Sequence, residues 1–147
     1  MIFTIFLIGL LFLAYFVFSD IKRMEVENLP ILAMFLVGMG ISVWNGQFFS
    51  TMLGFALFGT FGWYLWKKEA IGGADVKILA VLPFFMGSIG LPNLLVSLWV
   101  FLILMMMVTL PYVVINRLVG RKGKFIPFIP IIAITYVCFW VFRVSVW

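Results

Sequence analysis

The chain has 147 residues and a formal net charge of +5; 66% of its residues are hydrophobic and only 10% are charged. A soluble domain of this size has too little interior to hide so many apolar side chains, and ordinary domains carry about 25% charged residues. A soluble globular domain and a disordered chain are therefore excluded, and a polytopic membrane protein remains.

Six apolar runs follow one another along the chain, each bounded by charged or turn-forming residues. They cover residues 2–19, 29–44, 52–66, 76–89, 94–115 and 125–147. A spanning helix needs about 20 apolar residues, so we expect one all-α domain over residues 1–147, a bundle of six transmembrane helices with short loops. The second, third and fourth runs are short, so they either recruit flanking residues or lie inside the bundle. Pro83 is expected to bend the fourth helix.

The basic residues are distributed unequally between the two ends of these predicted helices. Arg143 alone lies near one face, and the other nine lie in or beside the odd-numbered connections: Lys22, Arg23, Lys67, Lys68, Lys77, Arg117, Arg121, Lys122 and Lys124. The positive-inside rule then places the odd connections in the cytoplasm and both termini outside the cell membrane. Arg143 is interpreted as an interfacial anchor. The asymmetry explains the net charge without a nucleic-acid partner.

Several kinds of catalytic chemistry are excluded by composition. The chain has no His and a single Cys, Cys138. A Ser-His-Asp triad, a His-bound metal and a disulfide framework are therefore impossible, and we expect no metal and no cofactor.

Two of the five acidic residues fall at the same predicted depth. Asp20 closes the first predicted helix and Asp75 opens the fourth, both at the cytoplasmic side. Two carboxyl groups in contact share one proton, so that one activates water while the other polarises a scissile carbonyl. The alternative is that each Asp only marks a helix end, with Asp75 as an N-terminal cap.

The helix dipoles predict which carboxyl group holds the shared proton. Asp20 lies at a helix C-terminus, where a negative charge is disfavoured, and Asp75 lies at an N-terminus, where it is favoured. Asp20 is therefore expected to be the protonated partner. Gly72 and Gly73, which precede Asp75, would allow a positive φ and close approach of a substrate backbone, or form a plain turn.

Three segments resemble motifs of one enzyme family. Residues 72–77, GGADVK, resemble the GxGD motif of the prepilin peptidases, which cleave type IV prepilins and archaeal preflagellins, although Ala74 replaces the second glycine. Residues 20–28, DIKRMEVEN, are similar to the family's Asp motif, which ends in hydrophobic-Pro-Asn, with Glu27 in place of Pro. Residues 125–130, FIPFIP, resemble the Pro-Phe-x-Pro stretch that opens the last helix.

The resemblance implies a membrane aspartic endopeptidase with Asp20 and Asp75 as its catalytic residues. Its partner would be a prepilin or preflagellin precursor with a basic leader and an apolar helix, cut at the cytoplasmic face of the bilayer. The CxxC pairs of the larger bacterial enzymes are not in this sequence, so N-methyltransferase activity is not expected.

Other polar residues near these motifs have two interpretations each. Lys77 holds the negative charge of the carboxyl pair or binds lipid headgroups; Asn28 bonds a loop or, as the favoured interpretation, caps the second helix. With Gly72 and Gly73 they form the expected substrate-positioning group. The remaining acidic side chains are solvated charges or contacts for the basic leader: Glu25, Glu27 and Glu69.

Three other functions remain open at this point. A presenilin-like protease shares the GxGD chemistry but cuts inside the membrane and has more spans. A small transporter or channel could use Asp20 and Asp75 as a proton or cation site, although such sites lie near the bilayer midplane. An assembly subunit would have no activity, and replacing both Asp residues would leave it intact.

Overall fold

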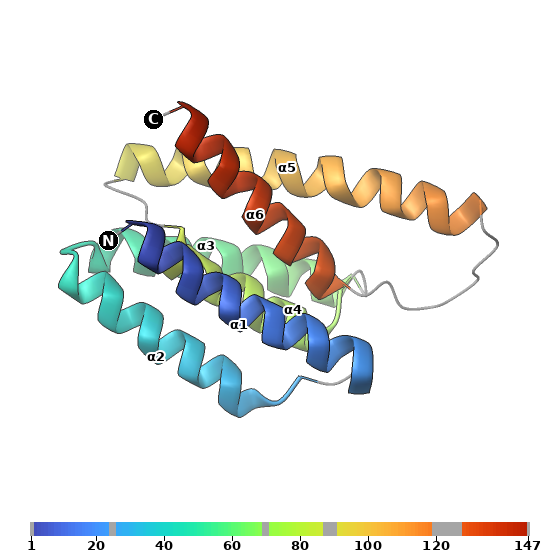
Figure 1. Cartoon of the computed structure of the whole chain (residues 1–147), viewed down its shortest axis with the longest axis horizontal. Helices are drawn as coiled ribbons and strands as arrows, with labels where there is room; N and C mark the ends of the chain where they lie inside the picture. The colour runs from blue at the N-terminus through green and yellow to red at the C-terminus, as the bar shows by residue number, and fades with distance from the viewer. Residues whose placement is uncertain (1, 24–25, 69–70, 87–90, 119–127, 147) are drawn as a thin grey trace.

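The computed structural model describes residues 2–23, 26–68, 71–86, 91–118 and 128–146, and these residues form helices and no strand (Figure 1). In chain order they form α1 (Ile2–Arg23), α2 (Asn28–Trp44), α3 (Phe48–Lys67), α4 (Gly73–Val81), the short 3-10 helix η1 (Leu82–Phe85), α5 (Leu91–Leu118) and α6 (Phe128–Val146). The predicted all-α fold with six α-helices is confirmed for this part of the chain.

The helices run back and forth between two ends of the molecule. α1, α3 and α5 end, and α2, α4 and α6 begin, at the end drawn on the right in Figure 1. α3 packs against α4, and α6 packs against both α1 and α5, while α2 lies against α4 and η1. The end of α1 and the start of α4 therefore lie at the same end of the bundle.

The fourth helix differs from the prediction of a span over residues 76–89. It begins at Gly73, and its α-helical part ends at Val81, where η1 continues with Pro83 in its first turn. Proline has no backbone N–H to donate and its ring clashes with the preceding turn, so the α-helix ends there instead of bending. Nine residues reach about 13 Å, well short of a bilayer core of about 30 Å. All residues from Ile78 to Met86 are buried, so protein surrounds this segment. This agrees with the alternative in which the fourth helix lies inside the bundle.

Two side chains of α6 bind the carbonyl groups at the end of this short segment. The Tyr136 hydroxyl donates to the Phe85 carbonyl oxygen at 3.1 Å, and Arg143 Nη1 donates to the Met86 carbonyl oxygen. The guanidinium also lies 5.2 Å from the ring centroid of Trp140. Helix ends leave carbonyls without intrahelical partners. Arg143 therefore satisfies such a group inside the protein, a role that its interpretation as an interfacial anchor did not include.

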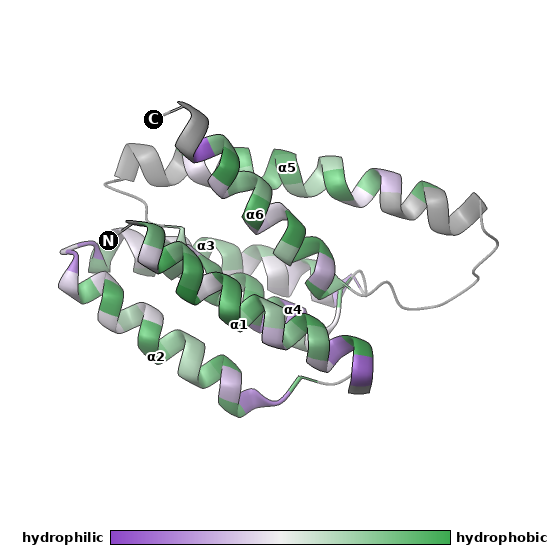
Figure 2. Cartoon of the chain, viewed as in Figure 1, coloured by the Kyte–Doolittle hydropathy of each residue, from purple (hydrophilic) through white to green (hydrophobic). Residues whose placement is uncertain are grey.

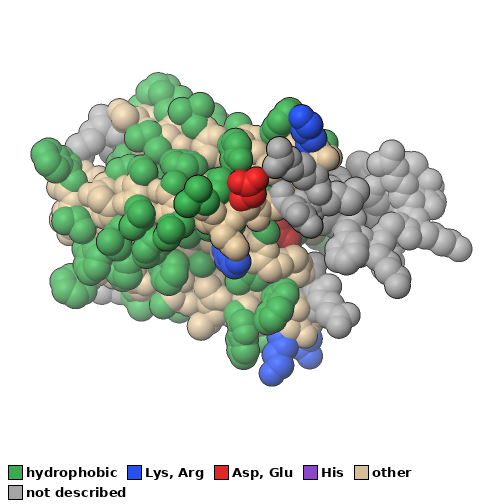
Figure 3. All heavy atoms as spheres, turned by 90° about the horizontal axis from the view of Figure 1, so that it is seen from below, with side chains coloured by type: hydrophobic (Ala, Val, Ile, Leu, Met, Phe, Trp, Pro, Cys, Tyr) green, Lys and Arg blue, Asp and Glu red, His purple; other side chains and the backbone are tan. Residues whose placement is uncertain are grey.

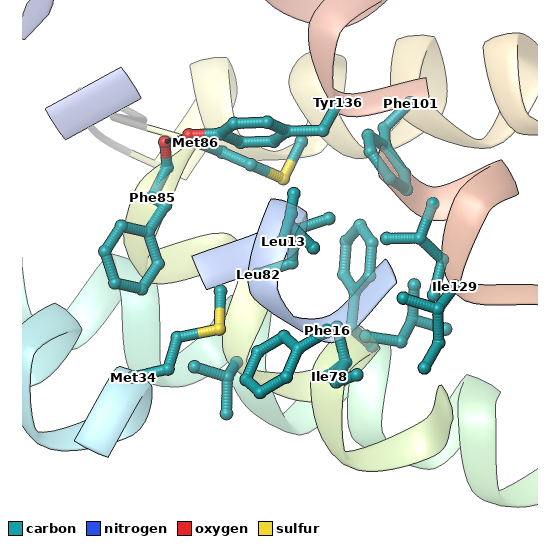
Figure 4. Close-up of a cluster of buried hydrophobic side chains, with 14 of the residues drawn as sticks. Leu13, Phe16, Met34, Ile78, Leu82, Phe85, Met86, Phe101, Ile129 and Tyr136 are labelled. Carbon is teal, nitrogen blue, oxygen red and sulfur yellow. Dashed lines mark hydrogen bonds between the residues drawn. The ribbon is translucent and has the colours of Figure 1, made fainter. Parts of the chain in front are cut away.

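The core gathers fully buried side chains from all six α-helices around α4 and η1. Figure 4 shows Leu13, Phe16, Met34, Ile78, Leu82, Phe85, Met86, Phe101, Ile129 and Tyr136 in one cluster. α3 adds Phe58, whose ring centroid lies 5.6 Å from that of Phe101. This packing fixes the position of α4 and of the Asp75 that it carries.

The outer surface is apolar over most of its length. Figure 2 shows hydrophobic residues along the helices and hydrophilic ones where α1 ends and α2 begins. On the face drawn in Figure 3, charged side chains gather toward that same end. Among the described residues, two helical stretches are long and apolar enough to cross a membrane, Phe3–Lys22 and Phe48–Lys67; the apolar stretches of α2, α5 and α6 are shorter. Helix length and composition thus support the predicted six-span bundle only in part.

Candidate active site

Asp20 and Asp75 are carried by two different kinds of helix end. Asp20 lies in the last turn of α1, which continues to Arg23, and its side chain is half-buried. Asp75 is the third residue of α4, after the N-cap residue Gly72, and it is only 9% exposed. Asp75 is therefore not the N-cap residue itself, but its carboxyl group binds the backbone N–H of the N-cap residue, so the alternative of an N-terminal capping role is confirmed in part.

The Asp75 carboxyl group folds back onto the glycine pair. Its Oδ2 accepts a hydrogen bond from the Gly72 N–H at 2.8 Å. Gly72 has φ −76° and ψ 161°, an ordinary extended conformation, so it does not use the positive φ that glycine would allow. A Cβ at Gly72 would lie 3.1 Å from Asp75 Oδ2, whereas one at Gly73 would lie 3.9 Å from its nearest neighbour, Trp66 Nε1. Gly72 is needed because the Asp75 carboxyl group approaches it closely.

Burial and a second carboxylate both act on the ionisation of Asp75. The pKa of Asp75 is raised to about 6, mainly by burial; the Gly72 hydrogen bond lowers the pKa, and the negative charge of Asp20 raises it. The two carboxyl groups thus interact electrostatically, although they are 55 residues apart in the sequence. Since Asp75 is the more deeply buried of the two, burial favours the proton on Asp75, whereas the helix dipoles favour it on Asp20.

The Asp20 carboxyl group also has a buried oxygen atom. Asp20 Oδ2 is buried and has no hydrogen-bond partner among the described residues. A buried acceptor without a donor is costly and rare. Asp20 Oδ2 is therefore a candidate acceptor for a proton or a substrate group at this end of the bundle.

Asn28 and Lys77 join the two motif segments directly. Lys77 Nζ donates to Asn28 Oδ1 at 2.6 Å, across 49 residues of sequence. The N-cap of α2 is Glu27, whose side chain makes no capping bond, and Asn28 is the first helical residue. The prediction that Asn28 caps the second helix is therefore wrong. Neither interpretation of Lys77 included its bond to Asn28.

Comparison with known protein families gives a match to the type IV leader peptidase family over residues 7–115. The chain belongs to this family. The match includes the segments around Asp20 and Asp75 and ends before residues 125–130, the third segment that resembles a motif. No curated protein and no solved structure matches the chain significantly. Family membership implies leader peptidase activity on prepilin-like precursors.

The structure describes only one of the other acidic residues expected near the site. Glu27 is exposed beside Asn28, while Glu25 and Glu69 lie outside the described residues. Lysines share this end: Lys22 lies 5.6 Å from the Phe18 ring centroid and Lys67 lies 5.4 Å from that of Trp63. Within the described residues no three His, Cys, Asp or Glu side chains lie close enough to hold a metal ion.

Sequence reasoning missed the residues that bind the end of η1. Tyr136 and Arg143 bind carbonyls 51 and 57 residues earlier in the chain. The one available signal was Arg143 itself, an isolated charge in an apolar run. A charge in such a run usually has a partner inside the protein.

Proposed function

We propose that this protein is a membrane-embedded aspartic endopeptidase that removes the basic leader from prepilin-like or preflagellin-like precursors at the cytoplasmic membrane face. The observation that carries the proposal is the electrostatic coupling of Asp20 and Asp75 at one end of the bundle. Family membership supports the peptidase activity. The apolar outer surface, with exposed side chains such as Leu11, Trp44 and Phe49, supports the bilayer as its surroundings.

The two carboxyl groups have different roles in the proposed reaction. In its protonated form, which burial favours, Asp75 donates a hydrogen bond to the scissile carbonyl oxygen, while ionised Asp20 accepts a proton from water. The water oxygen bonds to the carbonyl carbon, and the tetrahedral intermediate then collapses. The C–N bond breaks, and the departing amine takes a proton from Asp20. Because the Gly72 N–H binds Oδ2 of Asp75, Oδ1 is the oxygen left to carry the acidic proton.

Substrate orientation follows from the charges at this end. The precursor's apolar helix would lie in the bilayer and its basic leader in the cytoplasm. Glu27, exposed at the start of α2, is placed to attract that leader, and we assign Glu25 and Glu69 the same role. Asn28, Lys77, Gly72 and Gly73 form the positioning group around the carboxyl pair.

The cleavage test uses co-expression with candidate precursors and mass spectrometry of the products. The wild-type chain is expected to cut at the junction of leader and apolar segment. Asp20→Asn and Asp75→Asn should each lower cleavage by at least about a thousandfold, because water activation and carbonyl polarisation each need a group. Both variants should still insert into the membrane. Substantial turnover by either variant would contradict the proposed chemistry. Failure of the wild type to cut any precursor would favour a transporter or an assembly subunit.

Topology is tested with single cysteines in a Cys138→Ser background. Lys68→Cys, just after α3, should react with a membrane-impermeant maleimide added to the cytoplasmic side. Gln47→Cys, in the turn between α2 and α3, is the matched control and should react from the outside. The opposite pattern would overturn the orientation and the proposed placement of the leader.

A further inference from the structure

An apolar groove runs between α2 and α4, with α3 contributing to its lining. Its volume is about 730 Å³. The apolar side chains that line it include Leu29, Leu32, Phe35, Phe55, Val76 and Ala80. This space accepts a row of large side chains from one face of a helix, but not a whole helix of about 10–12 Å diameter.

The groove has a polar end, which lies beside the proposed carboxyl pair. Its two polar lining residues are Asn28 and Lys77, which are hydrogen-bonded to each other. Val76 and Lys77 directly follow Asp75 on α4. On α2 the lining extends from Asn28 to Phe35, about 10 Å along the helix axis. The groove therefore leads away from the active site for about two helical turns.

A second groove, between α1 and α6, provides a comparison within the same molecule. Its volume is about 510 Å³, and it is lined by apolar side chains and Cys138. Leu10 and Ile134 face each other across it from the two helices. Nothing in this lining distinguishes a peptide from a lipid acyl chain, because lipid tails are as apolar as Leu.

We infer that the α2–α4 groove binds the first two turns of the precursor's apolar segment, immediately after the scissile bond; this inference rests on the proposed function. A peptide helix that unwinds into an active site leaves N–H and C=O groups of its first turn without partners. The amide of Asn28 and the ammonium of Lys77 together supply both an acceptor and donors for such groups. An acyl chain needs neither. The polar end, which adjoins Asp75, therefore fits the start of a peptide segment that leaves the active site.

The inference is tested by cross-linking with a synthetic precursor. The probe has a Lys-rich leader, an apolar run of about 20 residues and one Cys at the third position after the cleavage point. Leu32→Cys and Ile134→Cys are made in a Cys138→Ser, Asp75→Asn background. Leu32 and Ile134 are matched in exposure, at 51% and 52%, and each lines a different groove.

Copper–phenanthroline oxidation should join the probe to the Leu32→Cys variant and not to the Ile134→Cys variant, because a disulfide needs Cα atoms within about 7 Å. Cleavage of the same probe is measured first with the Cys138→Ser chain that retains Asp75. Cleavage without preferential cross-linking at residue 32 would overturn the groove assignment and leave the proposed function standing. Absence of cleavage would contradict the proposed function, and the groove assignment with it.

A kinetic comparison gives a second readout that does not depend on cross-linking. Leu32→Trp fills the α2–α4 groove and should raise KM by about tenfold with little change in kcat, as expected for lost binding. Ile134→Trp fills the other groove and should leave both constants unchanged. Equal effects of the two variants on KM would show that neither groove selects the precursor.

Discussion

The helices that carry Asp20 and Asp75 differ in length, burial and surroundings. α1 has 22 residues, and many of its side chains face outward, while α4 has nine residues and is enclosed by α2, α3 and α6. The long helix brings its carboxyl group to one end of the bundle in a half-buried position. The short helix begins at the exposed Gly73, but Asp75 in its first turn is buried, so its carboxyl group lies in a drier environment. Two identical side chains thus acquire different ionisation behaviour from the helices that carry them.

Magnitudes show why burial outweighs the helix dipole at Asp75. A helix terminus changes the energy of a charge by about 0.3–1 kcal/mol. The rise of the Asp75 pKa from 3.8 to about 6 corresponds to up to about 3 kcal/mol, at about 1.4 kcal/mol per pKa unit. The dipole and the Gly72 N–H both favour the ionised form, so burial exceeds their combined effect.

The largest expected difference between the two Asp residues is in stability. Asp75→Asn removes a buried charge and should raise the free energy of unfolding at pH 7 by up to about 3 kcal/mol. In the wild type the native state binds more protons than the unfolded state between pH 3.8 and about 6, so stability falls as pH rises through this window. The gain from Asp75→Asn should therefore vanish below pH 4.

Thermal unfolding in detergent micelles, followed by circular dichroism from pH 4 to pH 8, measures this gain. Asp20→Asn is the matched control, and its gain at pH 7 should be smaller because the side chain is less buried. A larger gain in the free energy of unfolding for Asp20→Asn than for Asp75→Asn would contradict the order expected from burial.

A smaller effect is expected from the two glycines that precede Asp75. The Cβ of Gly72→Ala would lie 3.1 Å from Asp75 Oδ2 and should displace the carboxyl group by a few tenths of an ångström. Since small misplacements of catalytic groups are costly, kcat should fall by about tenfold. Gly73→Ala is the control, because its Cβ makes only ordinary contact with Trp66, and it should retain kcat. Cleavage rates are measured for both variants. An equal loss of kcat in both would indicate that the glycines are needed for the approach of the substrate instead.

The sequence predicted the features that depend on composition and chain order. Helical structure follows from long apolar runs, and the placement of Asp20 and Asp75 at one end follows from counting helices. The Asp and Gly-Asp segments also led to the family that the comparison confirmed. These inferences needed no knowledge of which helices are neighbours.

The features that were missed depend on contacts between distant segments. The bond from Lys77 to Asn28 and the bonds from α6 to Phe85 and Met86 join residues about 50 positions apart. The effect of burial on the shared proton was missed for the same reason, because the dipole can be estimated from one helix but burial depends on all its neighbours. The sequence shows Pro83, but whether this proline bends or ends a helix depends on which distant side chains bind the carbonyl groups left without helical partners.

The central claim is that Asp20 and Asp75 form one coupled pair in which Asp75 holds the proton. Infrared titration of the carboxyl groups tests it directly, with each Asp replaced in turn by Asn. We expect a carboxyl band that titrates near pH 6 in the wild type, disappears in Asp75→Asn and shifts to lower pH in Asp20→Asn, because the charge of Asp20 raises the Asp75 pKa. A band near pH 6 that survives Asp75→Asn and disappears in Asp20→Asn would contradict the assignment, and a band unchanged by Asp20→Asn would contradict the coupling itself.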